Sequence, residues 1–435
     1  MTAPSPEQEG AGEHPDPPAA RRRRRSREVG SGHAHGHGPV TIPAAEARRV
    51  RLVLAALVVP LLLATVVGLV ALWPRGETQI GSVPLTAEGA TFERGVVVDV
   101  PGTAGEEVVV AVRTGEHAGR EVSVQVPPEV MEAGVERGDE IRMLYLPGAA
   151  ATGSPFVYID FVRDVPIALL AAAYLLVVAL VARWRGVAAV VGLGASLVVV
   201  GLFVIPALTL GTSPLLVALV GSSAMMFLAV YLAHGVSIRT TTALLGTFAG
   251  LAITTLLGWW VIGGGNLVGN GSEEAYMVFS TFPGVSLSAL LLCGIVIAGL
   301  GALNDVTITQ ASAVWELHAS DPGAGRARVF ARAMRIGRDH IASTVYTLAF
   351  AYVGTSLPLL MIGAIYDRTL LEFLMAGEIV EEVARTLVSS IGLVLAIPAT
   401  TAISALLVGR SAPRPTPPPA RGGRRAAAAA DGDQR

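Results

Sequence analysis

A line of polar residues begins where a long apolar run ends, at Asn304 and Asp305. Thr309, Ser312 and Glu316 follow Asp305 at spacings that place all four side chains on one face of a helix. Charged groups near membrane hydrocarbon usually face a protein interior or a water-filled path. The pattern predicts a polar path in which Asp305 is partly buried and exchanges an ion. The alternative is an ordinary amphipathic helix that Asn304 or Asp305 caps.

A second group of polar residues stands at the start of a later apolar run. Asp339 precedes Ser343, Tyr346 and Thr347, and Ser343 and Thr347 share a helix face. Hydroxyl groups inside a membrane span bond to neighbouring helices or line a path. We add these four residues to the candidate polar path. For the charged part of this group, the alternative is an ion pair between Arg335 and Asp339, four residues apart.

Charged residues recur at helical spacing before the last apolar run, at Glu378, Glu381, Glu382 and Arg385. This predicts one fully charged helix face, with an ion pair between Glu381 and Arg385. Two adjacent carboxylates are also suited to binding a cation through oxygen. We favour the simpler interpretation, a structural helix at the membrane interface.

The sequence lacks the motifs of common membrane enzymes. It contains no lysine, which excludes a P-loop ATPase, and it has neither His-Glu-x-x-His nor a Gly-x-Ser-x-Gly turn. Cys293 is the only cysteine, which excludes an intramolecular disulfide and cysteine-based zinc or iron–sulfur sites. We expect no enzymatic activity, no cofactor, no bound metal and no nucleic-acid partner.

The elements that must position these residues are membrane spans. Of the 435 residues, 52% are hydrophobic and only 15% are charged, and the mean hydropathy is +0.58. Soluble globular chains are less apolar and more charged. Eight apolar runs can each cross a hydrocarbon core of about 30 Å. We therefore predict an all-α membrane bundle of about eight transmembrane helices, at 52–73, 165–182, 187–210, 214–233, 240–262, 284–303, 341–365 and 386–408.

Between the first two predicted spans the composition changes. Residues 75–164 contain short β-branched runs, such as Glu107-Val-Val-Val-Ala-Val and Glu121-Val-Ser-Val-Gln-Val, separated by Gly and Pro. They predict a small β-barrel of the SH3-like or OB-like type. The two ends, 1–50 and 409–435, are polar, proline-bearing and rich in arginine, and we expect both to be disordered tails.

The distribution of arginine predicts the orientation, because basic loops stay on the cytoplasmic side. With the N-terminus inside, the inner segments hold 23 of the 32 arginines. The predicted outer loop 264–280 has two glutamates and no arginine. We expect a multi-pass plasma-membrane protein whose spans contact the lipid bilayer. Both termini are expected in the cytoplasm and the β domain outside.

Three stretches of the sequence resemble the YibE/F family of bacterial multispanning membrane proteins. They are Gly299–Glu316, Gly337–Pro358 and Glu382–Pro398, and the similarity extends over about residues 160–408. The sequence departs from the family pattern at Asn304 and Tyr346. The resemblance implies a seven-helix membrane domain at 165–408, following the first span and the β domain, and it carries no established activity to this chain.

The polar stripes and the Gly and Pro breaks in the last three predicted spans favour a secondary transporter or permease of a small solute or ion. Irregular or polar backbone inside a membrane is tolerated where it lines a cavity. The alternative is a non-transporting envelope protein whose outer β domain binds a ligand or a partner. The sequence leaves the oligomeric state open.

Overall fold

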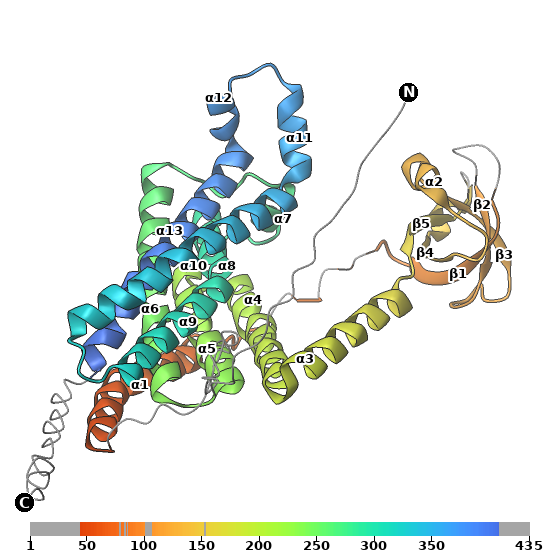
Figure 1. Ribbon diagram of the computed structural model, residues 1–435. Helices are drawn as coiled ribbons and strands as arrows, with labels where there is room; N and C mark the ends of the chain where they lie inside the picture. The colour runs from red at the N-terminus through yellow and green to blue at the C-terminus, as the bar shows by residue number, and fades with distance from the viewer. Residues whose placement is uncertain are drawn as a thin grey trace, which may run out of the picture. The chain divides into compact units, whose positions relative to one another are not determined.

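The computed structural model describes residues 44–77, 80–81, 84, 86–100, 107–151 and 154–408, and it contains a helical bundle and a small barrel (Figure 1). Most of the tails predicted at 1–50 and 409–435 lie outside these residues. Helix α1 (Ala44–Ala71) begins within the first tail, eight residues before the predicted span at 52–73. Its first turns contain Ala, Glu and Arg, which favour helix, so the helix extends beyond the apolar run.

Five strands form a closed barrel in the order β1-β2-β3-β5-β4, which confirms the small β-barrel predicted between the first two spans. All neighbouring strands are antiparallel except β3 and β5. The strands and the short helices between them are β1 (Thr91–Asp99), β2 (Val108–Val112), β3 (Glu121–Gln125), α2 (Pro128–Gly134), β4 (Glu140–Tyr145), η1 (Pro147–Ala151) and β5 (Phe156–Phe161).

The barrel core consists of the alternate inward side chains of these strands, including Val108 and Val110 of β2 and Ile141 and Met143 of β4. A glycine is required at position 95 of β1, because the Val110 side chain of the neighbouring strand β2 fills the space beside it. A Cβ at this position would lie 2.4 Å from Val110 Cγ1, which is closer than real Cβ atoms approach. The β-branched runs of the sequence thus form strands because they fill this closed interior.

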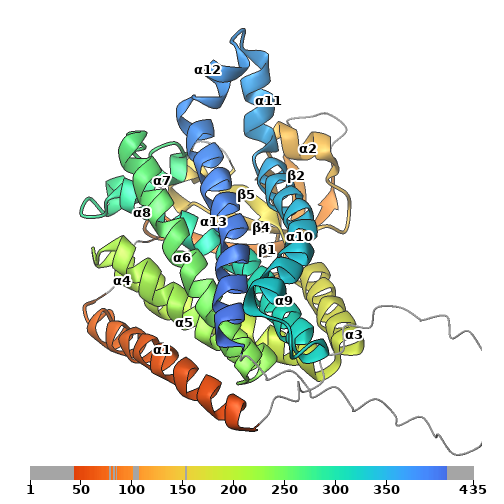
Figure 2. The same ribbon diagram turned by 60° about the vertical axis from the view of Figure 1, so that its left-hand side comes forward.

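The remaining helices follow the barrel in the chain. They are α3 (Asp164–Val199), the π-helical turn η2 (Val200–Val204), α4 (Ile205–Thr209), α5 (Pro214–His234), α6 (Ile238–Gly264), α7 (Glu273–Thr281), α8 (Leu287–Ala298), α9 (Leu300–Ser320), α10 (Arg326–Thr355), α11 (Leu357–Ile365), α12 (Leu370–Leu374) and α13 (Gly377–Leu407). Figure 2 shows α13 between α6 and α10, in contact with both.

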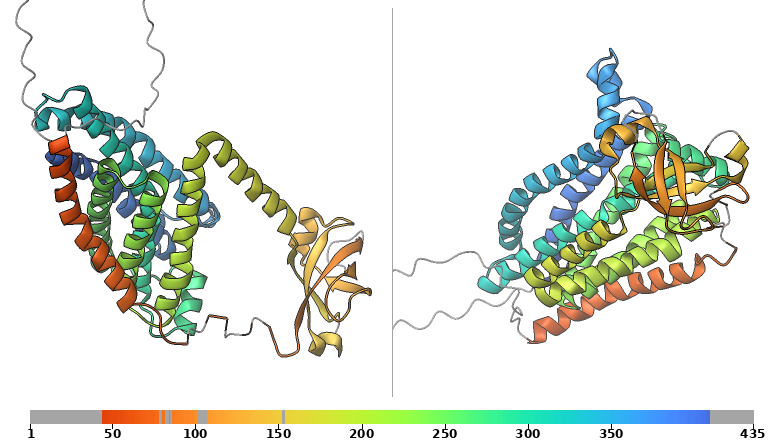
Figure 3. Two further views of the ribbon diagram at one scale, coloured as in Figure 1. Left: turned by 90° about the horizontal axis from the view of Figure 1, so that it is seen from below. Right: turned by 90° about the vertical axis from the view of Figure 1, so that its right-hand side faces the viewer.

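Six helical segments in the described residues are long and apolar enough to cross a membrane, or seven if the pair α10 and α11, bent by 66°, counts as one span. One segment, Asp164–Thr209, has 46 residues, about 69 Å of helix and more than twice a hydrocarbon core. Arg183 interrupts it with φ 55° and ψ −141°. The left panel of Figure 3 shows the sharp bend in α3. The sequence predicts two spans here, separated at this position.

Two of the apolar clusters within the bundle show how its helices pack. One joins α1, α5, α6 and α8 and includes Val58, Ala218, Leu251 and Leu292. The other joins α9 and α13 through Leu303, Val306, Leu393, Ala396 and Ile397. Burial of these side chains fixes which face of each helix points inward.

Contacts at the helix ends identify two opposite ends of the bundle. At one end, Arg239 Nη1 of α6 lies 3.5 Å from Glu316 Oε1 of α9. Arg326 Nε of α10 donates to the Val408 carbonyl at the end of α13, 3.2 Å away. At the other end, the amide of Gly269, after α6, donates to Glu381 Oε1 near the start of α13 at 2.8 Å. Helices α6 and α13 are therefore antiparallel across the full bundle.

Candidate functional site

One face of α13 carries small or polar residues along the whole helix. Arg385 is followed at intervals of three or four residues by five such residues. They are Ser389, Gly392, Ala396, Thr400 and Ser404. Ser404 lies 19 positions after Arg385, a distance of about 28 Å along the helix, close to the thickness of a hydrocarbon core. This face of α13 is therefore long enough to connect the two sides of a membrane.

Buried polar side chains from α6 and α9 meet this face. Together with those of α13 they form a set that we call the polar seam. Each of its members exposes 3% or less of its surface. The members are Thr247, Thr254, Thr307, Gln310, Ser389, Thr400, Thr401 and Ser404.

Helices α6 and α13 approach closely at two points of the seam, where a glycine of one helix faces a threonine of the other. A Cβ on Gly246 would lie 2.1 Å from Thr400 Oγ1, and a Cβ on Gly392 would lie 2.0 Å from Thr254 Oγ1. Small residues allow membrane helices to approach at their backbones. The glycines therefore bring the threonine hydroxyls into the helix interface.

Toward the Arg239 and Arg326 end, hydrogen bonds cross the seam. Thr247 Oγ1 and Thr307 Oγ1 are 2.7 Å apart. Gln310 Nε2 donates to Thr401 Oγ1 at 2.7 Å and to the Ala333 carbonyl of α10 at 3.0 Å. These contacts join α6, α9, α10 and α13, so direct hydrogen bonds link all four helices at this level of the seam.

Three hydroxyl groups of the seam have no hydrogen-bond partner among the described residues: Thr254 Oγ1, Ser389 Oγ and Ser404 Oγ. Hydroxyls of membrane helices commonly bond to the carbonyl four residues earlier, as Thr400 does with Ala396 at 2.7 Å. A buried polar atom without a partner costs about 1–3 kcal/mol and calls for an explanation such as a bound water or ion. At these three positions the seam has hydroxyl groups available to bond a water molecule, an ion or a polar ligand.

The seam itself contains no charged side chain, but a charged residue lies at the end of the bundle where Gly269 contacts Glu381. Arg385 Nε lies 3.4 Å from Glu382 Oε2, and both side chains are about two-thirds buried. The terminal nitrogen Nη1 of Arg385 reaches toward Gly294 of α8, 3.7 Å from the position of a Cβ there. The arrangement is an uncharged, hydroxyl-lined strip with one arginine at its end.

The structure places the predicted α9 stripe on the exposed side of its helix. Asp305, Thr309 and Glu316 are exposed, whereas Asn304 and Ser312 are partly buried. Thr309 Oγ1 donates to the Asp305 carbonyl at 2.8 Å. The expectation that Asp305 is partly buried is corrected, because the opposite, mainly apolar face of α9 packs into the bundle. That buried face includes Leu303, Val306, Thr307 and Gln310.

The second predicted group is also exposed. Asp339, Ser343, Tyr346 and Thr347 all point away from the bundle on α10, and Tyr346 exposes 62% of its surface. Ser343 Oγ donates to the His340 carbonyl at 3.1 Å, and Thr347 Oγ1 donates to the Ser343 carbonyl at 2.9 Å. Their hydroxyls are therefore bonded within their own helix. The described side chains of Arg335 and Asp339 form no ion pair with each other.

In the predicted outer charged face, the partners differ from those expected. Arg385 pairs with Glu382, three residues away, and not with Glu381. Glu381 accepts the hydrogen bond from the Gly269 amide, which draws it toward the loop after α6. Both carboxylates thus have structural contacts. The side chain of Glu378 lies outside the part of the chain that the structure describes.

The helices of the seam belong to the region that a known family covers. A family model described as YibE/F-like protein matches residues 170–410, more than half of the chain. The chain belongs to the YibE/F-like family. Neither the search of curated proteins nor the search of solved structures gave a match.

In this YibE/F-like chain, the seam residues carry only a weak signal in the sequence. Thr247 and Thr254 are seven residues apart, and Ser389, Thr400 and Ser404 are separated by eleven and four residues, so each set marks a helix face. Single hydroxyls in apolar runs are common, however, and only the contacts between α6 and α13 distinguish these from their neighbours. Small residues that repeat every three or four positions in 385–404 are the signal that points to the interface.

Proposed function

We propose that this YibE/F-like protein is a secondary transporter or permease that moves a small solute or ion along the polar seam. The observation that carries the proposal is the set of three buried hydroxyls without partners, on two helices that cross the whole bundle. Such groups gain hydrogen bonds when a hydrated ion or a polar solute enters. The direct bonds around Gln310 then correspond to a closed end of the path, and separation of α6 from α13 would open it.

We further propose eight spans in the plasma membrane, with both termini cytoplasmic and the barrel outside. Six segments are long and apolar enough to cross a membrane. Dividing the segment that contains α3 into two spans at Arg183, and adding the α10 and α11 pair as one span, supports the number eight. The contacts at the helix ends also support it. Arg239, Glu316, Arg326 and Val408, all assigned to the cytoplasmic side by the arginine distribution, lie at one end of the bundle. Gly269 and Glu381, assigned to the outside, meet at the other.

The test is flux into proteoliposomes that contain dyes for H⁺, Na⁺ or K⁺, followed by a panel of small polar solutes. In Thr254→Val and Ser389→Ala, we expect flux to fall at least about tenfold, because each change removes a hydroxyl at an unpartnered position. Thr255→Val and Ser390→Ala are the matched controls. Both are neighbouring residues outside the fully buried strip, and Thr255 bonds to the Leu251 carbonyl of its own helix.

Flux through Asp305→Asn distinguishes a path along the polar seam from a path along the exposed side of α9. Loss of flux in Asp305→Asn with normal flux in Thr254→Val and Ser389→Ala would place the path on that side. Absence of flux for every ion and solute, together with capture of a partner by the barrel residues, would contradict transport and favour an envelope protein that acts through its β domain.

A further inference from the structure

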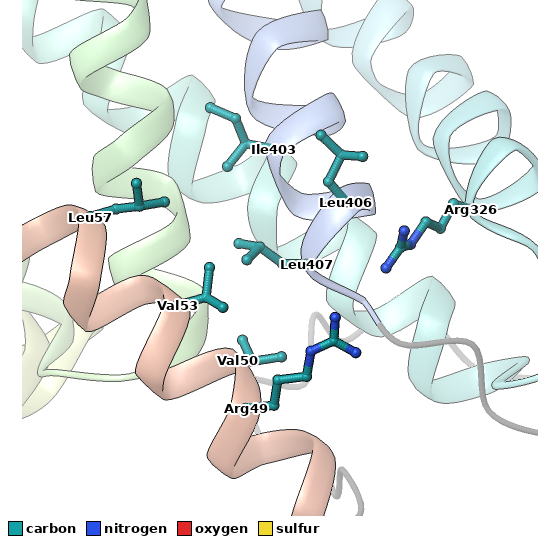
Figure 4. A pocket seen from close by; sticks show the side chains of 8 residues that line it. All are labelled: Arg49, Val50, Val53, Leu57, Arg326, Ile403, Leu406 and Leu407. Atoms are coloured by element: carbon teal, nitrogen blue, oxygen red, sulfur yellow. The ribbon is translucent and has the colours of Figure 1, made fainter.

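A side pocket opens between α1 and α13 at the end of the bundle where Arg326 contacts Val408. Its volume is about 440 Å³, within the range of small-molecule sites. Figure 4 shows its walls, with Val53 and Leu57 of α1 on one side and Leu406 of α13 on the other. The pocket is separate from the polar seam, whose members do not line it.

Two guanidinium groups stand at the mouth of this pocket. Arg49 of α1 and Arg326 of α10 extend toward each other beside Leu407 (Figure 4). Neither of them forms an ion pair with any carboxylate of a described side chain. The hydrogen bond from Arg326 Nε to the Val408 carbonyl orients that side chain, and its two terminal nitrogens have no hydrogen-bond partner among the described residues. Two guanidinium groups that line one pocket without a counter-ion among the described side chains favour an anion between them.

The start of α10 adds to the positive potential. Arg326 is the first residue of that helix, where free amide groups and the helix dipole favour a negative charge. A second arginine, Arg49, then faces this helix end across the pocket. The mouth is therefore suited to a phosphate group, which arginine binds in a bidentate manner.

The walls below the mouth are apolar and open to the side. Val53, Leu57 and Leu406 are 41%, 50% and 65% exposed. In a membrane protein these side chains meet acyl chains, and a groove between two spans can hold one of them in place. Basic pockets between transmembrane helices on the cytoplasmic side bind anionic lipid headgroups. The arginine distribution assigns this end of the bundle to the cytoplasm.

We propose that this pocket binds one anionic phospholipid, with its phosphate between Arg49 and Arg326 and an acyl chain along Val53, Leu57 and Leu406. The lipid would join α1, which precedes the region matched by the family, to the ends of α10 and α13. This inference is independent of the transported species, because the pocket and the seam share no residue.

The test is native mass spectrometry of the full chain purified with equal amounts of phosphatidylglycerol and phosphatidylcholine of the same chain length. We expect one phosphatidylglycerol to be retained in preference. In Arg49→Gln/Arg326→Gln its affinity should fall about thirtyfold, the factor that corresponds to two arginine contacts of about 1 kcal/mol each. Val53→Trp should also displace the lipid, by filling the groove while leaving both arginines in place.

The matched control is Arg48→Gln/Arg328→Gln. It removes the same charge from the same two helices at exposed residues that do not line the pocket. Equal loss of phosphatidylglycerol in both double variants would show a general charge effect and overturn the site. Equal retention of the two lipids by the parent, or displacement of the bound lipid by inorganic phosphate, would overturn it as well. If the glutamine variant does not fold, Val53→Trp and Arg49→Lys/Arg326→Lys still decide the question, since the lysine variant keeps the charge.

Discussion

Gln310 Nε2 donates a hydrogen bond to Thr401 Oγ1, 2.7 Å away, across the contact between α9 and α13. The same nitrogen donates to the Ala333 carbonyl of α10, so one amide group holds three helices. Gly337 of α10 lies against this amide, and a Cβ there would be 3.0 Å from Gln310 Oε1. Because Gly337 has no side chain, the Gln310 amide can lie close to the α10 backbone and reach both partners.

Gln310→Leu should lower the free energy of unfolding by about 1–3 kcal/mol, because it removes two interhelical hydrogen bonds at a buried position while keeping the side-chain volume. Denaturant unfolding in detergent micelles measures this change. Thr309→Val is the control, since Thr309 is exposed and bonded within its own helix. Equal stability of Gln310→Leu and the parent would show that these bonds do not hold the helices together.

Gly392→Ala should destabilise the bundle by about 1–3 kcal/mol through overpacking, because the new Cβ would meet Thr254 Oγ1. Thr254→Ala removes that atom, so the double variant should be more stable than the sum of the two single effects predicts. Gly301→Ala provides the control, because nothing lies within 4 Å of a Cβ there. Additive effects in the double variant would contradict the direct contact.

His117→Ala should destabilise the barrel by about 1–3 kcal/mol, the range for leaving a buried acceptor without its hydrogen-bond partner. Glu93 is fully buried, and its Oε1 lies 2.8 Å from His117 Nδ1. The His117 ring also packs at a tilt against the ring of Tyr145, with centroids 4.3 Å apart. Hydrogen–deuterium exchange of β1 and β2 in the full chain reports the change. The exposed neighbour variant Glu116→Ala should leave exchange unaltered, and equal effects of the two variants would rule out the buried pair as the cause.

Cysteine labelling tests the proposed orientation. In a Cys293→Ala background, Glu116→Cys and Ser272→Cys should react with a membrane-impermeant maleimide in whole cells, and Gly323→Cys only after lysis. All three positions are exposed, whereas Ala324 beside Gly323 is buried. Labelling of Gly323→Cys in whole cells would show that the bundle has the opposite orientation to the one proposed.

The sequence predicts the element types well because they depend on local patterns. Alternating β-branched residues in 107–126 form strands, and the apolar runs form helices. The grouping of Asp305, Thr309 and Glu316 on one helix face is equally local, and these residues do share the exposed side of α9. The spacing of residues, however, does not determine whether a helix face points into the bundle or toward its surface. In a membrane, a polar face can lie inward or outward, and the tertiary contacts decide.

The polar seam could not be predicted for the same reason. Its bonds join residues far apart in the chain, such as Thr247 with Thr307 and Gln310 with Thr401. Each residue alone is an unremarkable Thr or Gln in an apolar run. The pairing of Arg385 with Glu382 was also missed, because Glu381 is drawn away by the Gly269 amide, a contact between residues 112 positions apart.

The two glycine–threonine contacts between α6 and α13 restrict the ways in which these helices can move. Gly246 and Thr254 are eight residues apart, as are Gly392 and Thr400, so the contacts lie about 12 Å from each other along the crossing. One contact would leave the helices free to pivot around it, but two fix both rotation and axial position. Sliding would push a threonine side chain out of each glycine gap onto bulkier neighbours. The helices can therefore part sideways, as whole units, far more easily than they can slip along each other.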